Sequence, residues 1–236
     1  MLKSIELSSN RMKAVAIAAM FFDHLATIFL VVDSPAFVVL KSFGRIVMPT
    51  MCFFVASGYH HTSNLKKYLG RLFVFAVISH FPFVLALGFG VFQATSVMWP
   101  LFLGLGALVV VKAPDVHPII KLGAVGLACL LAVPADWNFV AVMWIVVFGV
   151  YHGNFKRQMI GFCLVGVFLL FGPIVFRHFE HGFNIQWFQL AIFLAVPFLA
   201  SYNGRQGKKS RWFARLFYVF YPVHLLLLYF VRILLA

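Results

Sequence analysis

Apolar runs long enough to cross a lipid bilayer recur along almost the whole chain. The first run, residues 14–32, has only Asp23, His24 and Thr27 as polar members. A helix needs about 17–25 mainly apolar residues to span a membrane. Segments that approach this length, some short and interrupted by Gly or Pro, lie near residues 14–32, 37–57, 67–87, 94–111, 119–134, 138–151, 158–175, 186–200 and 212–235. The pattern predicts an all-α, polytopic integral membrane protein with about nine transmembrane helices, within a range of roughly eight to ten.

The composition excludes a water-soluble globular fold. Of the 236 residues, 63% are hydrophobic and only 11% are charged, whereas a soluble domain has roughly 25% charged and about 45–50% apolar residues. Cys52, Cys129 and Cys163 lie in apolar segments, without a CxxC pair or a His/Cys ligand spacing. We therefore expect neither a disulfide nor a metal site. Residues 1–236 are predicted to form a single membrane-embedded domain whose first span is not cleaved.

Positive charge is concentrated in alternate connections between the apolar segments. All but four of the 19 Lys and Arg residues lie in the N-terminal segment or near 58–71, 112–121, 152–157 and 201–215. The exceptions are Lys41, Arg45, Arg177 and Arg232. By the positive-inside rule, the N-terminus is cytoplasmic and the C-terminus is outside. The net charge of +13 is thus spread over short loops beside the lipid bilayer, and no nucleic-acid partner is expected.

An acid and an imidazole, Asp23 and His24, stand side by side in the middle of the first apolar run. Ionisable groups at that depth are costly and generally mark a functional site. Lys13 precedes His24 by eleven residues, which is about 16 Å and nearly three turns of an α-helix. The lysine at the membrane face and the imidazole near mid-bilayer therefore share one helix face. Such an arrangement suits an enzyme that takes an anionic substrate from one side and reacts within the bilayer.

Arg45 lies in the second apolar segment and needs a partner or access to an interface. Asp23 is the candidate partner, because the first two segments form an antiparallel hairpin. Asp23 is about 100° round the helix from His24, so we expect it to order Arg45 or the acceptor rather than the His24 ring. The alternative is an ion pair that only joins two helices.

A second intramembrane histidine, His224, lies in the last segment, one turn after Tyr221. Pro222 lies between them, removes a helix hydrogen bond and is expected to kink the span. Histidines in two different helices suggest a polar cavity inside the bundle. The alternative is a buried histidine that is bonded to the backbone carbonyl that the proline leaves open.

The second segment ends in Ser57-Gly58-Tyr59, followed by His60 and His61. Gly58 is expected to break the helix and to allow close backbone approach. Adjacent histidines point to different sides of most backbones, so a metal site is not expected without further ligands. The loop is either a cytosolic binding site or an ordinary wet interface.

Two further positions carry open interpretations. Lys67 and Arg71 lie one turn apart on a common helix face, where they either hold a phosphate or pyrophosphate or anchor the span by positive charge alone. Asp136 falls in the short outer turn between the fifth and sixth segments. It is either solvated or in contact with a substrate that approaches from outside.

These residues, in this order, resemble the TraX family, small integral membrane proteins linked to acetylation of F-type pilin. The resemblance spans nearly the whole chain and is weakest across residues 88–130 and 152–210. It rests on Lys13…Asp23-His24, Gly44-Arg45-Ile46-Val47-Met48-Pro49, Ser57-Gly58-Tyr59, Lys67-Tyr68-Leu69-Gly70-Arg71-Leu72, Ser79-His80-Phe81-Pro82, Ala135-Asp136-Trp137 and Phe217-Tyr218-Val219-Phe220-Tyr221-Pro222-Val223-His224.

TraX proteins in turn look related to the membrane-bound acyltransferase-3 group. In its first helix that group has a basic residue, ten intervening residues and a histidine, the pattern basic-x10-His. It also has an SGY/F helix end before a basic stretch, and a Tyr-x-x-His in a late helix. The matching residues here are Lys13-x10-His24, Ser57-Gly58-Tyr59 and Tyr221-Pro222-Val223-His224, with lysine where arginine is usual.

The resemblance implies a transmembrane acetyltransferase of the bacterial inner membrane, with cytosolic acetyl-CoA as co-substrate and no metal. For this family the acceptor is the N-terminal amine of a membrane-inserted pilin subunit. His24 and Asp23 are the expected catalytic residues, with His24 as general base or as a transiently acetylated relay. The expected binding residues are Lys13, Lys67 and Arg71 for the phosphates, together with Arg45, Ser57, Tyr59, Asp136, Tyr221 and His224.

Three alternatives remain open from the sequence. The acceptor can instead be a sugar hydroxyl or a lipid of the envelope. A proton-coupled transporter would use Asp23 and His24 as a relay, although no inverted repeat with matching broken helices is visible. A non-enzymatic pilus-assembly factor would be indifferent to replacement of His24.

Overall fold

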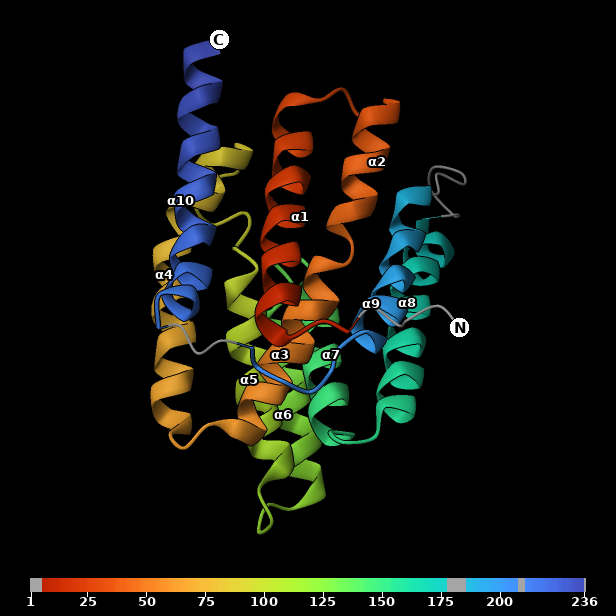
Figure 1. Ribbon diagram of the computed structural model, residues 1–236. Coiled ribbons are helices and arrows are strands. Elements are labelled where there is room, and N and C mark those ends of the chain that lie inside the picture. Colours follow the sequence, from red (N-terminus) through yellow and green to blue (C-terminus); the bar gives the residue numbers. More distant parts are fainter. Residues whose placement is uncertain (1–5, 178–185, 208–210, 236) are drawn as a thin grey trace. The chain divides into compact units, whose positions relative to one another are not determined.

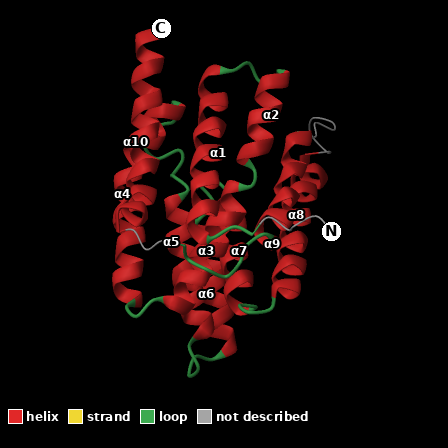
Figure 2. Ribbon diagram, in the orientation of Figure 1, coloured by secondary structure: helices red, strands yellow, loops and turns green. Residues whose placement is uncertain are grey.

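The computed structural model describes residues 6–177, 186–207 and 211–235, without the side chains of 169–177 and 211–217. Within these ranges the chain is helical and has no strand (Figures 1 and 2). The predicted all-α fold is confirmed. The chain divides into two compact units: unit 1 comprises Met1–Thr50, Leu85–Gly88 and Trp187–Ala236, and unit 2 comprises Met51–Val84 and Phe89–Gln186. The single membrane-embedded domain stays a prediction.

Unit 1 is built around α1, Ser9–Phe29, which packs against α2, Pro35–Gly44, and against α10, Arg211–Leu235. The 3-10 helix η1, Trp187–Leu194, packs on α2 and continues into α9, Ala195–Ala200. The rings of Phe37 and Phe188 meet edge to face at 5.8 Å and join α2 to η1. Figure 1 shows α1 and α2 as the neighbouring, antiparallel helices that the sequence predicts.

Unit 2 contains most of α3, Val47–His61, and of α4, Leu65–Leu87, both of which have one end in unit 1. It continues with α5, Met98–Lys112, α6, Pro118–Leu131, α7, Asn138–Val150, and α8, Phe155–Arg177. Helix α7 packs against α5, α6 and α8 and forms the centre of the unit. Its Trp144, Ile145 and Phe148 side chains are fully buried, as expected of a helix with neighbours on several sides.

Short polar side chains mark where several helices begin. Ser34, Asn64 and Asn154 each accept a hydrogen bond from the backbone N–H three residues later, at 3.3, 2.8 and 3.1 Å. Such caps satisfy one of the N–H groups that a helix start leaves without an intrahelical partner. Local sequence therefore sets the starts of α2, α4 and α8.

The second predicted span is one apolar stretch divided into two helices. Helix α2 ends at Gly44 and α3 begins at Val47, with Arg45 at the break. Pro49 explains the break, because it has no N–H to donate to the Arg45 carbonyl four residues earlier and its ring crowds that carbonyl. The interruption places Arg45 at a helix end inside an otherwise apolar stretch.

Among the residues that the structure describes, four helical stretches are long and apolar enough to cross a membrane: Ser9–Phe29, Pro35–His61, Leu65–Leu87 and Tyr218–Leu235. On α4 the large apolar side chains of Phe73, Val77 and Phe81 are exposed at successive turns, as expected of a surface that faces lipid. These features indicate a membrane protein. Helices α6 and α7, with 14 and 13 residues, rise only about 20 Å against a hydrocarbon core of about 30 Å. The nine spans and the cytoplasmic N-terminus therefore stay predictions.

Candidate functional site

Helix α1 places Lys13 and His24 on one continuous helix of 21 residues. The expected shared face follows, because eleven residues of unbroken helix bring the two side chains almost back into line. His24 is buried, with 7% of its surface exposed, whereas Lys13 is half-buried nearer the start of the helix. The helix therefore aligns a cation near one end with an imidazole in its second half.

His24 of α1 contacts His224 of α10 directly. The His24 Nδ1 and His224 Nε2 atoms are 3.0 Å apart, and the ring centroids are 5.0 Å apart. His224 is only 3% exposed, and the Phe220 ring stacks on it at 4.7 Å. The sequence placed both histidines in one region, but it gave no signal that the two rings share a hydrogen bond.

The hydrogen-bond network assigns the tautomer of each ring. His224 Nδ1 lies 2.7 Å from the backbone oxygen of Phe220. A carbonyl oxygen only accepts, so His224 carries its proton on Nδ1. With both rings neutral, His224 Nε2 is then an acceptor, and His24 must donate from Nδ1. The remaining nitrogen of His24, Nε2, holds a lone pair.

The carbonyl that anchors His224 differs from the one suggested by the sequence. The alternative interpretation had His224 bonded to the carbonyl that Pro222 leaves open. That carbonyl belongs to Tyr218, four residues before the proline, whereas His224 bonds to Phe220, four residues before itself. The interpretation of a backbone-bonded histidine is right, and the carbonyl is wrong.

Tyr221 completes the surroundings of this pair. It is 2% exposed, and its ring lies edge-on to His24, with centroids 6.0 Å apart, and to His224 at 5.7 Å. Tyr221 and His224 share a helix face because they lie three residues apart in α10. The structure thus brings both residues, which the sequence assigned to the site, next to His24; their role in binding stays a prediction.

Asp23 pairs with two cations, on a different side of α1 from the His24 ring. Its Oδ1 accepts from Arg45 Nη2 and its Oδ2 accepts from Lys41 Nζ, both at 3.0 Å. The predicted Asp23–Arg45 pair is confirmed; that Asp23 orders Arg45 or the acceptor, rather than the His24 ring, stays a prediction. Lys41 was missed, since it was assigned only to an outer connection. Its four-residue spacing from Arg45, which places both on one helix face, was the available signal.

Other contacts hold this ion cluster of Asp23, Lys41 and Arg45 in place. Lys41 Nζ also donates to Thr27 Oγ1 at 3.0 Å. Arg45 Nη1 donates to Gln189 Oε1 at 3.2 Å, and its guanidinium lies 5.5 Å from the Phe188 ring of η1. Charged groups in such surroundings need these partners because burial without them is costly.

Gly44 permits the close approach of α2 to α1 at the ion cluster. A Cβ atom at this position would collide with the Asp23 side chain. The glycine of the Gly44-Arg45 motif is thus explained by Asp23, a role that sequence inspection did not assign.

The remaining predicted site residues belong to unit 2. Helix α3 continues through Gly58 to His61, so the predicted helix break at Gly58 is wrong. The expected close approach is confirmed, because a Cβ there would lie 2.7 Å from the Tyr68 hydroxyl oxygen. Ser57 and Tyr59, on either side of it, are half-buried.

Lys67 and Arg71 are both exposed near the start of α4. The Arg71 guanidinium lies 5.5 Å from the Tyr68 ring. Asp136 lies in the turn between α6 and α7, where its backbone N–H donates to Thr95 O at 2.9 Å. Within the described parts of the chain, no group of His, Cys, Asp or Glu is arranged to hold a metal ion.

Comparison with known proteins identifies the family. The family model described as TraX protein matches residues 8–232. A curated protein of Dichelobacter nodosus, "Probable fimbrial assembly protein FimC, serogroup H1", is 31% identical over 240 residues, which covers 97% of this chain and 97% of that protein. No solved structure matches the chain. Both sequence matches extend over nearly the full length, and the chain therefore belongs to the TraX family.

Proposed function

We propose that this protein is a transmembrane acetyltransferase of the bacterial inner membrane. It moves an acetyl group from cytosolic acetyl-CoA to an acceptor at or beyond the membrane, namely the N-terminal amine of a pilin subunit. The observation that carries the proposal is the buried His24–His224 pair, which leaves the His24 Nε2 lone pair available. Membership of the TraX family and the similarity to a fimbrial assembly protein support a pilus-related role.

In the proposed reaction His24 accepts one proton and later returns it. The acceptor nitrogen attacks the thioester carbonyl carbon and loses a proton to His24 Nε2 as the new C–N bond forms. The C–S bond then breaks, and the departing thiolate recovers that proton from His24, which gives free CoA thiol. A relay through acetyl-His24 uses the same lone pair as a nucleophile.

His224 acts as a positioning residue for this step. When His24 Nε2 takes up a proton, the Nδ1–H of His24 still donates to His224 Nε2, so the contact of 3.0 Å is kept in both states. The hydrogen bond becomes charge-assisted and therefore stronger as the imidazolium forms. No side chain has to reorganise, which is the condition under which fixed dipoles help a reaction most.

An N-terminal amine suits a base of this kind better than a lysine side chain does. The α-amino group has a pKa of about 8, whereas a lysine amine has a pKa of about 10.4. At neutral pH roughly one α-amine in ten is uncharged and nucleophilic, against fewer than about one lysine in a thousand. Acceptor selection by protonation state therefore favours a chain terminus. A sugar hydroxyl or a lipid remains the alternative acceptor.

The hydrogen-bond network disfavours a proton-coupled transporter. A proton relay needs titratable groups at both ends, yet among the described residues the chain from His24 passes to His224 and ends on the Phe220 carbonyl. A backbone carbonyl does not pass a proton onward. Asp23, the other candidate for a relay, is bonded to Lys41 and Arg45.

Reconstitution of the purified full-length protein in liposomes tests the proposal. Acetyl-CoA is supplied together with either a peptide that carries the pilin N-terminus or the same peptide with a blocked N-terminus. We expect an acetyl group on the free α-amine, detected by mass spectrometry, with one CoA thiol released for each acetyl transferred. Thermal stabilisation by acetyl-CoA without transfer points to another acceptor. Solute flux without CoA release, or no response to acetyl-CoA at all, contradicts an acetyltransferase.

A further inference from the structure

Three exposed histidines meet at one end of unit 2, outside the His24–His224 pair. His60 and His61 end α3, and His152 lies in the turn between α7 and α8. The rings of His60 and His152 are stacked, 4.0 Å apart and inclined by 18°. The rings of His61 and His152 lie 5.7 Å apart. The expectation that adjacent histidines point to different sides therefore fails here, since both reach the same third ring.

Backbone carbonyls fix the tautomers of two of these rings. His60 Nε2 lies 2.9 Å from Gly149 O, and His61 Nδ1 lies 2.8 Å from Ser57 O. Since carbonyls only accept, both nitrogens carry protons. The opposite nitrogens, Nδ1 of His60 and Nε2 of His61, accept when the rings are neutral and become donors when the rings are protonated.

The geometry of this histidine cluster does not suit a metal ion. Imidazole lone pairs lie in the ring planes, and the nearly parallel planes of His60 and His152 do not converge on one point. Among the described residues, no group of three or more His, Cys, Asp or Glu side chains could hold a metal ion.

The electrostatics of the cluster favour an anion. Burial, then His60, His61 and Lys112, lower the pKa of His152. These are the groups that face His152 from the ends of α3 and α5, and none of them is a carboxylate. The Tyr59 ring lies 5.0 Å from the His60 ring, edge to face. Protonation of the cluster is therefore opposed by mutual repulsion, which an anion with two or more charges would relieve.

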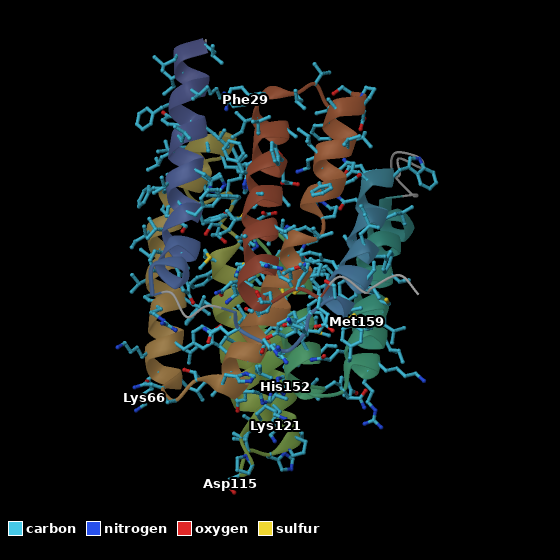
Figure 3. All side chains as sticks on the ribbon, in the orientation of Figure 1. Phe29, Lys66, Asp115, Lys121, His152 and Met159 are labelled. Atoms are coloured by element: carbon cyan, nitrogen blue, oxygen red, sulfur yellow. The ribbon has the colours of Figure 1, made fainter. Side chains whose placement is uncertain are left out.

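Further cations lie toward the same end of this unit. Figure 3 shows Lys66, Lys121 and His152 toward one end of unit 2. Lys66 and Lys121 lie near the starts of α4 and α6, and His152 lies in the turn after α7. The positive-inside rule predicts that all three positions are on the cytosolic side. A polyanion from the cytosol would meet a positive field before it reaches the imidazoles.

We infer that His60, His61, His152 and Lys112 form a binding site for a phosphate-bearing anion, namely the phosphates of the acyl donor. The source of these phosphates rests on the proposed acetyltransferase function, whereas the chemistry of the site rests on the cluster itself. Bound phosphate oxygens accept hydrogen bonds from the protonated histidines and from Lys112, so binding takes up protons. The residues expected to bind the phosphates of the acyl donor then include these four, from three helix ends, in addition to Lys67 and Arg71.

Binding to the full-length protein in detergent tests this inference. CoA, inorganic pyrophosphate and phosphatidylglycerol vesicles are titrated separately at pH 6, 7 and 8. Uptake of one proton predicts up to about tenfold tighter binding of CoA and pyrophosphate for each unit of falling pH. In the double variant His60→Gln/His152→Gln, binding at pH 6 should weaken by about tenfold or more, which is the loss expected for one charge-assisted hydrogen bond. The matched control is His117→Asn, since His117 is exposed and its capping bond to Ile119 N–H can be kept by asparagine.

Each outcome decides a separate point. Equal affinity of the double variant and the wild-type protein for CoA, or binding that does not vary with pH, overturns the site. Vesicle binding that depends on the histidines, without CoA binding, also overturns it, because the phosphates would then be those of lipid. Histidine-dependent CoA binding without acetyl transfer upholds the anion site and contradicts the proposed function. Acetyl transfer together with unchanged CoA binding in the double variant upholds the proposed function and contradicts the anion site.

Discussion

Two groups of histidines in this protein differ in almost every physical respect. His24 and His224, in unit 1, are 7% and 3% exposed and are bonded to each other. His60, His61 and His152, in unit 2, are exposed and meet through ring contacts. The first pair comes from positions 200 residues apart, whereas two members of the second group are neighbours in the chain.

The difference shows how surroundings set the role of an imidazole. In unit 1, a chain of hydrogen bonds ends on the Phe220 carbonyl and fixes which nitrogen of His24 is a lone pair. In unit 2, His152 is exposed to solvent, and burial followed by the neighbouring positive groups lowers its pKa. A fixed lone pair suits proton transfer at one atom, while a titratable cluster suits the reversible binding of an anion.

The ion cluster of unit 1 also differs from the histidine cluster of unit 2, because its two cations share the Asp23 carboxylate. Replacing Asp23 by alanine would leave Lys41 and Arg45 partly buried without it. We expect a loss of about 3–5 kcal/mol in unfolding free energy, as when one member of a buried pair is removed. Unfolding in detergent measures the effect. The control Asp115→Ala removes an exposed loop acid and should change stability by less than about 0.5 kcal/mol; equal stability of both variants would contradict a structural role for the cluster.

Replacing His224, the hydrogen-bond acceptor of the His24 Nδ1–H, tests its role as a positioning residue. His224→Phe removes the acceptor for the His24 Nδ1–H and should slow acetyl transfer by about 10- to 100-fold. His224→Gln can offer its amide oxygen to the same proton and should recover part of the rate. The pH profile of transfer should shift in the phenylalanine variant and return toward that of wild type in the glutamine variant. Equal rates and profiles for both variants would mean that His224 only fills space.

The contact of Gly44 with Asp23 gives a smaller effect in the same unit. Gly44→Ala introduces a Cβ that collides with the Asp23 side chain, and overpacking of this kind costs about 1–3 kcal/mol. Gly70 is the matched control, since a Cβ there meets nothing within 4 Å. Alanine in that exposed helical position should stabilise the protein by about 0.5–1 kcal/mol. Denaturation of the two variants should therefore show changes of opposite sign.

The smallest expected effect is the pH dependence of unit 2. The folded state lowers the pKa of His152 from 6.5, through burial first and then through His60, His61 and Lys112. Its neutral form is therefore the one that folding favours. The stability from this group is present above pH 6.5 and is lost as the pH falls through the lower, folded-state pKa.

Thermal unfolding measured from pH 8 to pH 5 tests this sign. The wild-type melting temperature should fall more steeply toward acid than that of His152→Gln, in phosphate-free buffer. Added pyrophosphate should reduce the difference, since a bound anion favours the protonated cluster. A steeper fall of the melting temperature in His152→Gln would contradict a lowered pKa of His152.

Local features of the sequence predicted several parts of the site correctly. The spacing of Lys13 and His24 along one helix needs only helical geometry. The Asp23–Arg45 pair follows from the cost of isolated charge in an apolar hairpin. Tyr221 and His224 share a face because they are one turn apart. All three cases depend on a single element or on two consecutive ones.

Contacts between distant segments could not be predicted in this way. The bond between His24 and His224 depends on how α1 packs against α10, and the stack of His60 on His152 depends on how α3 ends beside α7. Gly58 appeared to be a helix breaker, yet it stays helical because a glycine can also serve close packing, here against Tyr68. Lys41 was counted only among the charges of the outer connections, and its bond to Asp23 also depends on how α1 and α2 pack side by side.

The central claim is that His24 Nε2 receives the proton of the acceptor amine. The most direct test measures the release of CoA thiol from acetyl-CoA in the presence of that acceptor. The measurement compares the wild-type protein, His24→Gln and the control His80→Gln, a half-buried histidine of α4 in unit 2, after matched melting temperatures have been shown. Loss of the general base predicts a rate about 10²- to 10⁴-fold lower in His24→Gln, with His80→Gln close to wild type. A folded His24→Gln protein that releases CoA at the wild-type rate would contradict the account.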